Sequence, residues 1–389
     1  MNRLSPVHKI NVCHIIAKMV YGGASIGTLH LVEKLDSKLF ACTIIHGFQS
    51  ENEGRLLAHG RRKNLNFITL PSLVREINLI KDFLTFLRLV AILKKHRYKI
   101  VHTHGSKAGV IGRIAAGVAR TPVILHTVHG WGLKAGNSFA QMFFRFIEKI
   151  IATFTTKLLF QTEADMKEAE LYKIGEAAKY YFIGNGINLR SFLHYDQHSV
   201  EHARLKFNPG GRRVIGTIGR VSAQKNPEGF VKIAQGVLQK RKDVIFLFVG
   251  GGELLEQMRE KIRVLNLSDY IVFTGVVEDI PPLLAIFDIF ILPSLWEGLP
   301  RSLLEGMAMA KPVVAHKVSG IDEIINNGFN GITVAINRYD LFVDAINNLL
   351  EDNDLCKKFG TAARKTALNY DYENVIDRTI NLYLDLADD

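Results

Sequence analysis

The stretch Ile291-Leu-Pro-Ser-Leu-Trp-Glu-Gly-Leu-Pro-Arg-Ser-Leu-Leu-Glu305 is the part of the chain from which we interpret the rest. It begins as the end of an apolar strand, Pro293 and Ser294 stop that strand, and a helix is expected over residues 302–310. Glu297 then lies on the loop between strand and helix, and Glu305 lies in the helix. Ligands of open α/β sheets bind at the carboxyl ends of strands, and a helix N-terminus there favours phosphate.

Two glutamates alone are weak evidence for a site, because one on a loop and one on a helix face are often simply solvated. Here they follow a strand and Pro-Ser, and they precede a second buried strand at 311–315. In this setting the chain resembles the retaining nucleotide-sugar glycosyltransferases of family four, whose second half carries an E-x7-E signature. The resemblance places Glu297 beside the donor sugar as a catalytic residue and Glu305 on the ribose hydroxyls. It adds three loop residues to the donor site: Gly298, Leu299 and Pro300.

The order of elements along the chain predicts an α/β fold. With 389 residues, two domains are expected, and strands alternate with helices in both halves. The resemblance implies the GT-B architecture, in which two doubly wound Rossmann-like domains face each other across a cleft. We expect an acceptor-binding domain over 1–190, a linker over 191–212, a donor-binding domain over 213–370 and a C-terminal helix over 371–389 that crosses back to the first domain.

Charge and composition limit the possible partners. Residues 1–190 carry a net charge of +15 and residues 191–389 a net charge of −4, which favours an anionic partner for the first half. No nucleic-acid-binding module is visible, so we favour an anionic membrane. Neither a membrane-spanning run nor a signal-peptide core is present, so we expect a cytoplasmic protein on the inner face of the cytoplasmic membrane. The 3 cysteines are widely spaced and fit reduced thiols.

The first half contains two candidate site segments at strand ends. Gly22 and Gly23 follow the first strand, where a tight turn is one interpretation and a close approach to phosphate is the other. His129 follows the strand at 122–127, and a lone histidine is more often packed in a core. The resemblance assigns the glycine pair to the donor diphosphate and His129, as a catalytic residue, to the donor sugar. Three more histidines lie near strand ends: His102, His104 and His126. A cluster of histidines could suggest a metal site, but a metal site usually adds carboxylates or i, i+4 spacing, and neither is present.

The second half adds cations to the site. Arg220 and Lys225 bracket the turn after the strand at 213–219, and two fixed cations suit a diphosphate leaving group, although isolated cations are usually solvated. The resemblance assigns both to the donor phosphates, and it assigns the backbone at Val277 to the nucleobase. Because these cations replace a metal, we expect no cofactor and no metal requirement. A further helix is expected to begin at 319–323.

Residues 139–154 form a segment rich in phenylalanine that we expect to be helical. One interpretation is that all of it is core, and the other is that an exposed part contacts lipid. Basic runs at 61–63 and 94–97 in the same half would assist binding to an anionic surface, or they are solvated helix ends.

We therefore expect an enzyme, a retaining hexosyl- or N-acetylhexosaminyltransferase. By resemblance, its donor would be a nucleotide sugar, most commonly a UDP-sugar, and its acceptor a lipid-linked or membrane-associated glycan of bacterial surface polysaccharide or lipopolysaccharide. The alternatives are a nucleotide-sugar epimerase or another enzyme of the same fold without a membrane acceptor, because fold does not fix reaction. A non-enzymatic binding protein is disfavoured by the four charged site residues in the second half.

Overall fold

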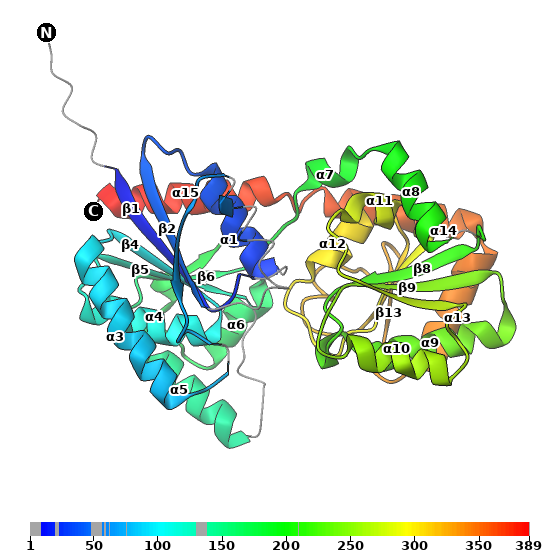
Figure 1. Cartoon of the computed structure of the whole chain (residues 1–389), viewed down its shortest axis with the longest axis horizontal. Coiled ribbons are helices and arrows are strands. Elements are labelled where there is room, and N and C mark those ends of the chain that lie inside the picture. Colours follow the sequence, from blue (N-terminus) through cyan, green and yellow to red (C-terminus); the bar gives the residue numbers. More distant parts are fainter. Residues whose placement is uncertain are drawn as a thin grey trace, which may run out of the picture. The chain divides into compact units, whose positions relative to one another are not determined.

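The computed structural model describes residues 9–19, 23–47, 57, 60–61, 63–74, 76–129, 138–208 and 210–388, and it leaves the side chains of 138–140 and 388 undescribed. The chain forms two compact units (Figure 1). Unit 1 consists of Met1–Gly184 and Asn374–Asp389, and unit 2 consists of Asn185–Glu373. Gly22, one of the predicted donor-binding residues, lies outside the described residues.

Unit 1 is built from alternating strands and helices. Its strands are β1 (Ile10–Ile16), β2 (Phe40–Gly47), β3 (Asn66–Leu70), β4 (Ile100–His104), β5 (Val123–Val128), β6 (Lys157–Phe160) and β7 (Tyr180–Phe182). Its helices are α1 (Gly23–Lys34), α3 (Leu79–His96), α4 (Ser106–Val118), α5 (Ser138–Phe154), α6 (Glu163–Leu171), the 3-10 turn η3 (Ala177–Lys179) and α15 (Tyr372–Asp388). Most of α15 therefore lies in the same unit as β1, although the two elements are far apart in the sequence.

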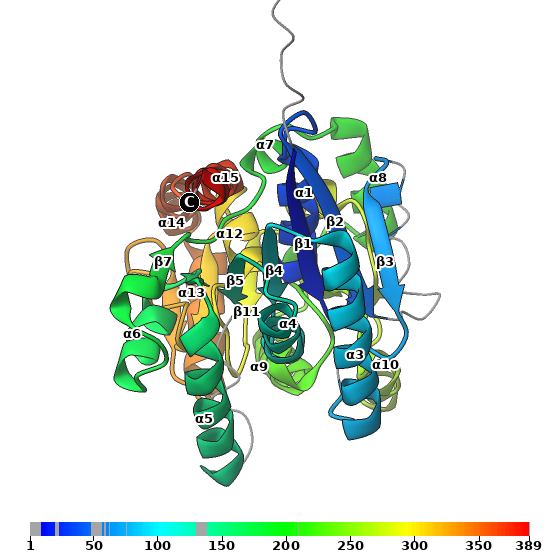
Figure 2. The same ribbon diagram turned by 90° about the vertical axis from the view of Figure 1, so that its left-hand side faces the viewer.

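The sheet of unit 1, within the described residues, has the order β3-β2-β1-β4-β5-β6-β7, and all its pairs are parallel. Side chains of β1 alternate between its faces. Cys13 and Ile15 pack in a cluster that also contains Leu89 of α3, whereas Ile16 packs in a cluster that contains Leu29 of α1. Both faces are therefore covered, which explains why these strands are apolar almost throughout (Figure 2).

Unit 2 is also built from alternating strands and helices. Its strands are β8 (Arg213–Ile218), β9 (Val244–Val249), β10 (Ile271–Gly275), β11 (Ile289–Leu292), β12 (Val313–His316) and β13 (Ile332–Val334). Its helices are α7 (Leu189–Leu193), α8 (Gln197–Phe207), the 3-10 turn η4 (Ala223–Lys225), α9 (Pro227–Lys240), α10 (Leu255–Val264), α11 (Ile280–Ala285), α12 (Arg301–Ala308), α13 (Tyr339–Glu351) and α14 (Asn353–Ala367).

The sheet of unit 2, within the described part of the chain, has the order β10-β9-β8-β11-β12-β13 with parallel pairing. The chain moves outward from β8 to β10 and then returns to place β11 on the other side of β8. This reversal makes the β8/β11 boundary the topological switch point, the position at which open α/β sheets bind ligands. In both units, the expectation of a doubly wound parallel sheet is confirmed.

Two expectations about local structure differ from the structure. The segment 191–212 was expected to be a linker, but α8 and most of α7 lie in it, and Phe192 and Val200 are buried in the core of unit 2. No helix begins at 319–323, where the chain forms turns, because Gly320 has φ +81 and interrupts helical geometry.

Candidate functional site

Lys225 and Glu297 form an ion pair at the switch point of unit 2. Lys225 ends the turn after β8, and Glu297 lies on the loop after β11, so adjacent strands bring them together. Lys225 Nζ donates to Glu297 Oε1 at 2.6 Å, and the two side chains are only 15% and 6% exposed. The predicted sugar-binding carboxylate and the predicted phosphate-binding cation are therefore in direct contact.

The turn that carries Lys225 is fixed by its neighbours. Asn226 has left-handed geometry with φ 52, its side chain accepts from Gly229 N and caps α9, and its Nδ2 donates to Pro293 O at 3.1 Å. The Lys225 side chain lies against Gly219, where an added Cβ would come within 2.9 Å of Lys225 Cε. The end of β8 and the end of β11 are thus tied together beneath the ion pair.

Gln224 holds the loop that carries Glu297. Its backbone oxygen accepts from Leu295 N at 2.9 Å, and its Nε2 donates to Trp296 O at 3.0 Å and to Glu297 Oε2 at 3.4 Å. Both carboxylate oxygens of Glu297 therefore have a donor within unit 2. Sequence reasoning missed Gln224, and its position beside Lys225 was the available signal.

The loop and helix after Glu297 carry the other residues that were predicted for the donor site. Gly298 O lies where a Cβ on Gly320 would be, at 1.3 Å, so Gly320 must be glycine for the two segments to meet. Leu299 O accepts from Asn185 Nδ2 at 3.3 Å. Pro300 is the N-cap of α12 and has no side chain that can cap the helix, which leaves the helix start suited to a phosphate.

Glu305 lies in α12 close to the same charges. It is half-buried, and burial raises the pKa of its carboxyl, while the nearby cations Arg301 and Lys225 lower it. Glu305, Lys225 and Glu297 thus belong to one electrostatic group. Arg301, directly after Pro300, was not singled out from the sequence.

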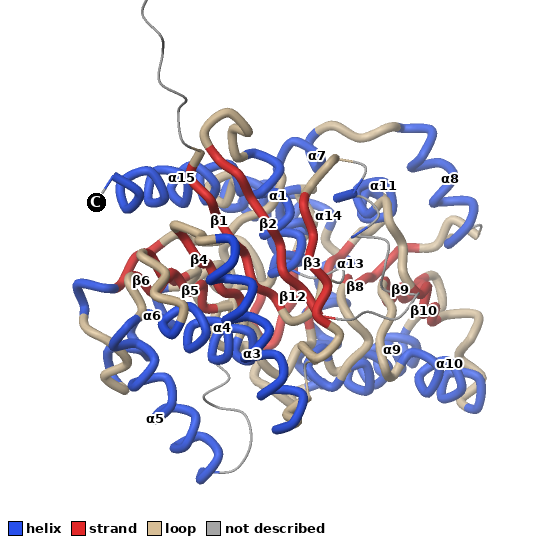
Figure 3. Tube along the Cα trace, turned by 60° about the vertical axis from the view of Figure 1, so that its left-hand side comes forward, coloured by secondary structure: helices blue, strands red, loops and turns tan. Residues whose placement is uncertain are grey.

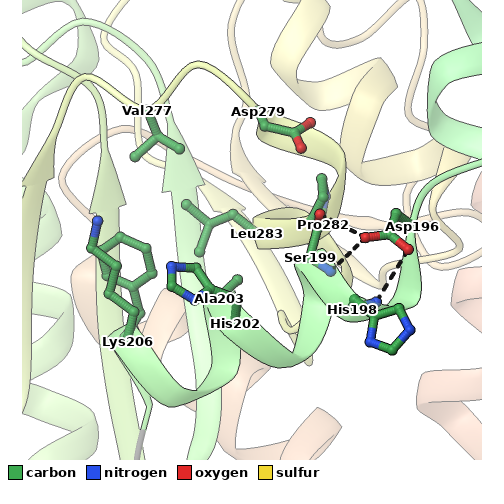
Figure 4. A pocket seen from close by; sticks show the side chains of 11 residues that line it. Asp196, His198, Ser199, His202, Ala203, Lys206, Val277, Asp279, Pro282 and Leu283 are labelled. Atoms are coloured by element: carbon green, nitrogen blue, oxygen red, sulfur yellow. Dashed lines mark hydrogen bonds between the residues drawn. The ribbon is translucent and has the colours of Figure 1, made fainter.

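Arg220 and Val277 lie at the edges of this group. Arg220 Nε lies 3.0 Å from Glu253 Oε2, and both side chains are about half exposed, so this pair is weak and open to a competing anion. The side chain of Val277 lines a pocket between α8 and α11 together with His202, Lys206 and Leu283 (Figure 4). The nucleobase role predicted for the backbone at Val277 stays a prediction.

In unit 1, His129 follows β5 and is half-buried. Its Nδ1 lies 3.2 Å from Gln161 Oε1, and its Nε2 lies 3.3 Å from His104 Nδ1. Gly23, the described member of the glycine pair, is the first residue of α1 and is exposed. The two described residues predicted for the site in unit 1, Gly23 and His129, therefore follow strands, as expected for a ligand site.

A group of buried histidines lies beside His129. His14 on β1 is paired in register with His102 on β4, and ring nitrogens of His14, His102 and His104 all lie within 4.8 Å of one another. Burial lowers the pKa of His14 from 6.5 to about 3 and the pKa values of His102 and His104 well below 6.5. Three neutral imidazoles at this spacing could ligate a metal ion. His14 was not predicted, because its role depends on strand order.

His126 faces away from this group. Its Nδ1 lies 2.9 Å from Thr103 Oγ1, and its ring packs against Gly109 of α4. Burial lowers its pKa well below 6.5, so it is a neutral core histidine.

Comparisons with known proteins identify two glycosyltransferase domains in this chain. The family described as Glycosyltransferase Family 4 matches residues 21–191, and the family described as Glycosyl transferases group 1 matches residues 201–366. The UDP-Gal:alpha-D-GlcNAc-diphosphoundecaprenol alpha-1,3-galactosyltransferase of Escherichia coli is 29% identical over 389 residues, which cover 97% of this chain and 98% of that relative. The N,N'-diacetylbacillosaminyl-diphospho-undecaprenol alpha-1,3-N-acetylgalactosaminyltransferase of Campylobacter jejuni is 26% identical, covering 77% of this chain and 80% of that relative.

Solved structures share the fold. HepE of Anabaena in complex with UDP and glucose superposes with a TM-score of 0.81 at 18% identity, covering 96% of this chain and 99% of that one. A glycosyltransferase of Rickettsia africae superposes with a TM-score of 0.77 at 24% identity, covering 97% and 99%. The expected GT-B fold is thereby confirmed.

Proposed function

Because this chain is a member of glycosyltransferase family 4, we propose that it transfers a hexose or N-acetylhexosamine, with retention, from a UDP-sugar to a polyprenyl-diphosphate-linked saccharide. The product would be an intermediate of a bacterial surface polysaccharide. The observation that carries the proposal is the Lys225–Glu297 pair at the switch point of unit 2. The proposal takes its donor and acceptor classes from the names of the two relatives above.

The residues of unit 2 suit the departure of a nucleoside diphosphate. When the bond between the sugar and the diphosphate breaks, the electron pair goes to a phosphate oxygen, and Lys225, Arg220 and the start of α12 would stabilise the developing charge. Glu297 would bind the sugar and Glu305 the ribose hydroxyls. The acceptor hydroxyl forms the new glycosidic bond, and its proton would pass to the leaving diphosphate. Because protein cations supply the positive charge, the proposed reaction needs no metal ion.

A membrane-bound acceptor would require a surface of unit 1 that contacts the membrane, and the candidate for that surface is α5. Five apolar side chains on one side of α5, the outer stripe, are between 38% and 60% exposed: Met142, Phe143, Phe146, Ile150 and Phe154. The opposite side of α5 is held down by Glu148, which accepts from Arg113 of α4 at 2.7 Å with both side chains buried. Ile151 and Ala152 of α5 are buried beside Glu148, so the outer stripe is a second apolar side of the helix that faces solvent, as at a surface that binds an apolar partner.

Helix α3 extends the apolar surface. Its first turns, together with Ile77 just before the N-cap, expose six large apolar side chains, between 43% and 82%: Ile77, Leu79, Ile80, Phe83, Leu84 and Leu87. Both α3 and α5 pack against α4, and the views in Figures 2 and 3 place α4 between them. Asp82 and Lys107 form an ion pair at 2.6 Å that fastens the start of α3 to the start of α4.

Basic residues on the same two helices support an anionic partner for this surface. Arg88, Lys94 and Lys95 of α3 and Lys149 of α5 are exposed. Each Lys or Arg near an anionic bilayer contributes roughly 1 kcal/mol, and inserted phenylalanines add a part that salt does not screen. No helix in the described ranges is both long and apolar enough to cross a bilayer. We therefore propose peripheral binding to the anionic cytoplasmic leaflet, where the acceptor would be met.

Vesicle co-sedimentation tests the membrane part. The protein should bind phosphatidylglycerol-containing vesicles, bind pure phosphatidylcholine vesicles weakly, and lose binding after Phe146→Glu. The matched control is Val264→Glu, because Val264 is 64% exposed on α10 of unit 2 and lies outside the proposed surface. Equal binding to neutral and anionic vesicles, or equal effects of the two substitutions, would contradict this part of the proposal.

A radiolabelled-donor assay separates the transferase from an epimerase. A panel of UDP-sugars is incubated with and without a polyprenyl-diphosphate-linked saccharide, and label is followed into the lipid fraction. Transfer requires the acceptor, whereas an epimerase changes the donor sugar without it. Conversion of the donor in the absence of acceptor would favour the epimerase.

A further inference from the structure

We propose that His316, the last residue of β12, is a positioning residue for Glu297. Its Nδ1 donates to the backbone oxygen of Ser294 and thereby fixes the start of the segment on which Glu297 lies, residues 293–299, which we call the glutamate loop. The inference rests on the proposed function for the role of Glu297 at the donor sugar.

The glutamate loop continues β11 beyond its last backbone pair with β12. In the sheet of unit 2, β11 lies between β8 and β12, and its ladder with β12 ends at the pair Leu292 and Ala315. Because an extended chain is pleated, successive backbone oxygens point toward alternate neighbouring strands. The first two oxygens of the loop keep this alternation beyond the ladder, where side chains act as their donors.

Two side chains hold those oxygens from opposite sides. Asn226, in the turn after β8, donates from Nδ2 to Pro293 O at 3.1 Å. His316, at the end of β12, donates from Nδ1 to Ser294 O at 3.2 Å. The start of the glutamate loop is therefore held on the β12 side as well as on the β8 side.

The segment that begins at His316 contacts the glutamate loop near both of its ends. His316 contacts the loop at Ser294, and Gly320, four residues later, lies against the oxygen of Gly298, where an added Cβ would come within 1.3 Å. Glu297 lies between these two contact points in the sequence. The position of its carboxylate therefore depends on the residues that follow β12.

The acceptor determines the direction of the bond from His316. Ser294 O is a backbone oxygen, which accepts and cannot donate, so the proton of the ring lies on Nδ1. The ring is fully buried beside α13, where Phe342 meets it edge to face with centroids 5.4 Å apart and Tyr339 lies 6.1 Å away. Burial also lowers the pKa of His316 below 6.5, so the ring is neutral at neutral pH.

Packing alone does not account for a histidine at this position. His316 Nε2 is buried and has no hydrogen-bond partner among the described residues. A buried polar atom without a partner destabilises a fold, and an apolar side chain of similar volume would avoid that cost. The part of the imidazole that the structure uses is the Nδ1–H group, which is directed at the glutamate loop.

Two substitutions separate the donor from the ring. The side-chain nitrogen of asparagine is as many bonds from the backbone as Nδ1 of histidine, so His316→Asn can keep the donation to Ser294, whereas His316→Leu removes it. His316→Met also removes the donor, and it takes the place of His316→Leu if that variant does not fold. The matched control is Asn208→Leu, because Asn208 is buried and its Nδ2 donates to Arg212 O at 2.6 Å, just before β8 and at the opposite edge of the sheet.

Hydrogen exchange with peptide mass spectrometry follows the loop without any substrate. Leu295 N donates to Gln224 O at 2.9 Å, so its exchange reports whether the glutamate loop is held. Peptides that span the loop should exchange faster in His316→Leu than in the wild-type protein, and at the wild-type rate in His316→Asn and Asn208→Leu. Unchanged exchange in His316→Leu, or equal acceleration in His316→Asn, would overturn the proposal.

Transfer kinetics test the consequence for Glu297. His316→Leu should lower kcat by roughly tenfold to a hundredfold and change the KM for the donor much less, because Lys225 and Glu305 lie outside the glutamate loop. His316→Asn should recover most of kcat, and Asn208→Leu should leave kcat and KM unchanged.

The combined results distinguish the inference from the proposed function. Faster exchange of the loop with an unchanged kcat in His316→Leu, or equal losses of kcat in His316→Leu and His316→Asn, would overturn the positioning role. If the wild-type protein transfers no sugar while loop exchange follows the predicted pattern, the proposed function fails and the hold of His316 on the glutamate loop stands.

Discussion

Mild acid should destabilise unit 1 far more than unit 2. Besides His46, four histidines of unit 1, His14, His102, His104 and His126, are at most 5% exposed, and burial lowers their pKa values to well below 6.5, to about 3 for His14. The unfolded chain binds a proton at each histidine as pH falls through 6.5, whereas the folded unit does not. The stability contributed by neutral histidines is therefore present above pH 6.5 and is lost as pH falls below it.

The size of the loss follows from the number of protons. At about pH 5.5, each unfolded histidine gains about 1.4 kcal/mol from protonation that the folded unit cannot share. Four such groups lower the free energy of unfolding by about 5–6 kcal/mol. Domains are stable by about 5–15 kcal/mol, so unit 1 should approach its unfolding midpoint in mild acid. In unit 2, burial lowers the pKa of one described histidine, His316, so a much smaller loss is expected there.

Urea titrations at about pH 7.5 and pH 5.5, read by pulsed hydrogen exchange and peptide mass spectrometry, follow the two units separately. Peptides of unit 1 should show a large decrease in urea midpoint at the lower pH, and peptides of unit 2 a small one. In His126→Asn, the pH-dependent loss should be smaller by about 1.4 kcal/mol, because one titrating group is gone. Equal shifts in the two units, or no shift in unit 1, would show that these histidines accept protons in the folded protein and would refute the reasoning.

Three further predictions concern unit 2. Lys225→Ala should weaken UDP-sugar binding by about 1.5–3 kcal/mol in calorimetry. The control Lys240→Ala, which removes an exposed ion pair with Asp344, should leave the affinity unchanged. Equal affinities of the two variants would show that Lys225 does not belong to the site. Transfer activity should survive EDTA, and loss with chelator that magnesium or manganese restores would contradict the proposed charge stabilisation. Gly320→Ala should lower thermal stability and activity more than Gly328→Ala. Both positions have positive φ, but only at Gly320 would an added Cβ collide with the Gly298 oxygen. Similar effects of the two substitutions would show that this contact is unimportant.

The contact between Lys225 and Glu297 could be anticipated from the sequence, although the two residues are 72 positions apart. Lys225 and Glu297 each follow a buried strand, and parallel strands end at a common edge, so strand order alone brings them together. Gln224 and Gly320 were missed because their roles come from contacts across the loop rather than from a pattern in the sequence.

The contact between His14 and Tyr383 could not be predicted from local patterns. His14 and Tyr383 lie at opposite ends of the sequence, and only the return of α15 to unit 1 joins them. The same holds for α5, whose periodicity identifies an amphipathic helix but not which side faces the core. The buried pair of Arg113 with Glu148 decides that question, since it fastens the side of α5 that carries Glu148 inward.

The most direct test of the central claim is transfer of radiolabelled sugar from a UDP-sugar panel to a polyprenyl-diphosphate-linked saccharide by the wild-type protein and by Glu297→Gln. We expect acceptor-dependent incorporation of one sugar with retained anomeric configuration, and a loss of transfer in Glu297→Gln without loss of folding. Incorporation with inverted configuration, or full activity in Glu297→Gln, would contradict the account.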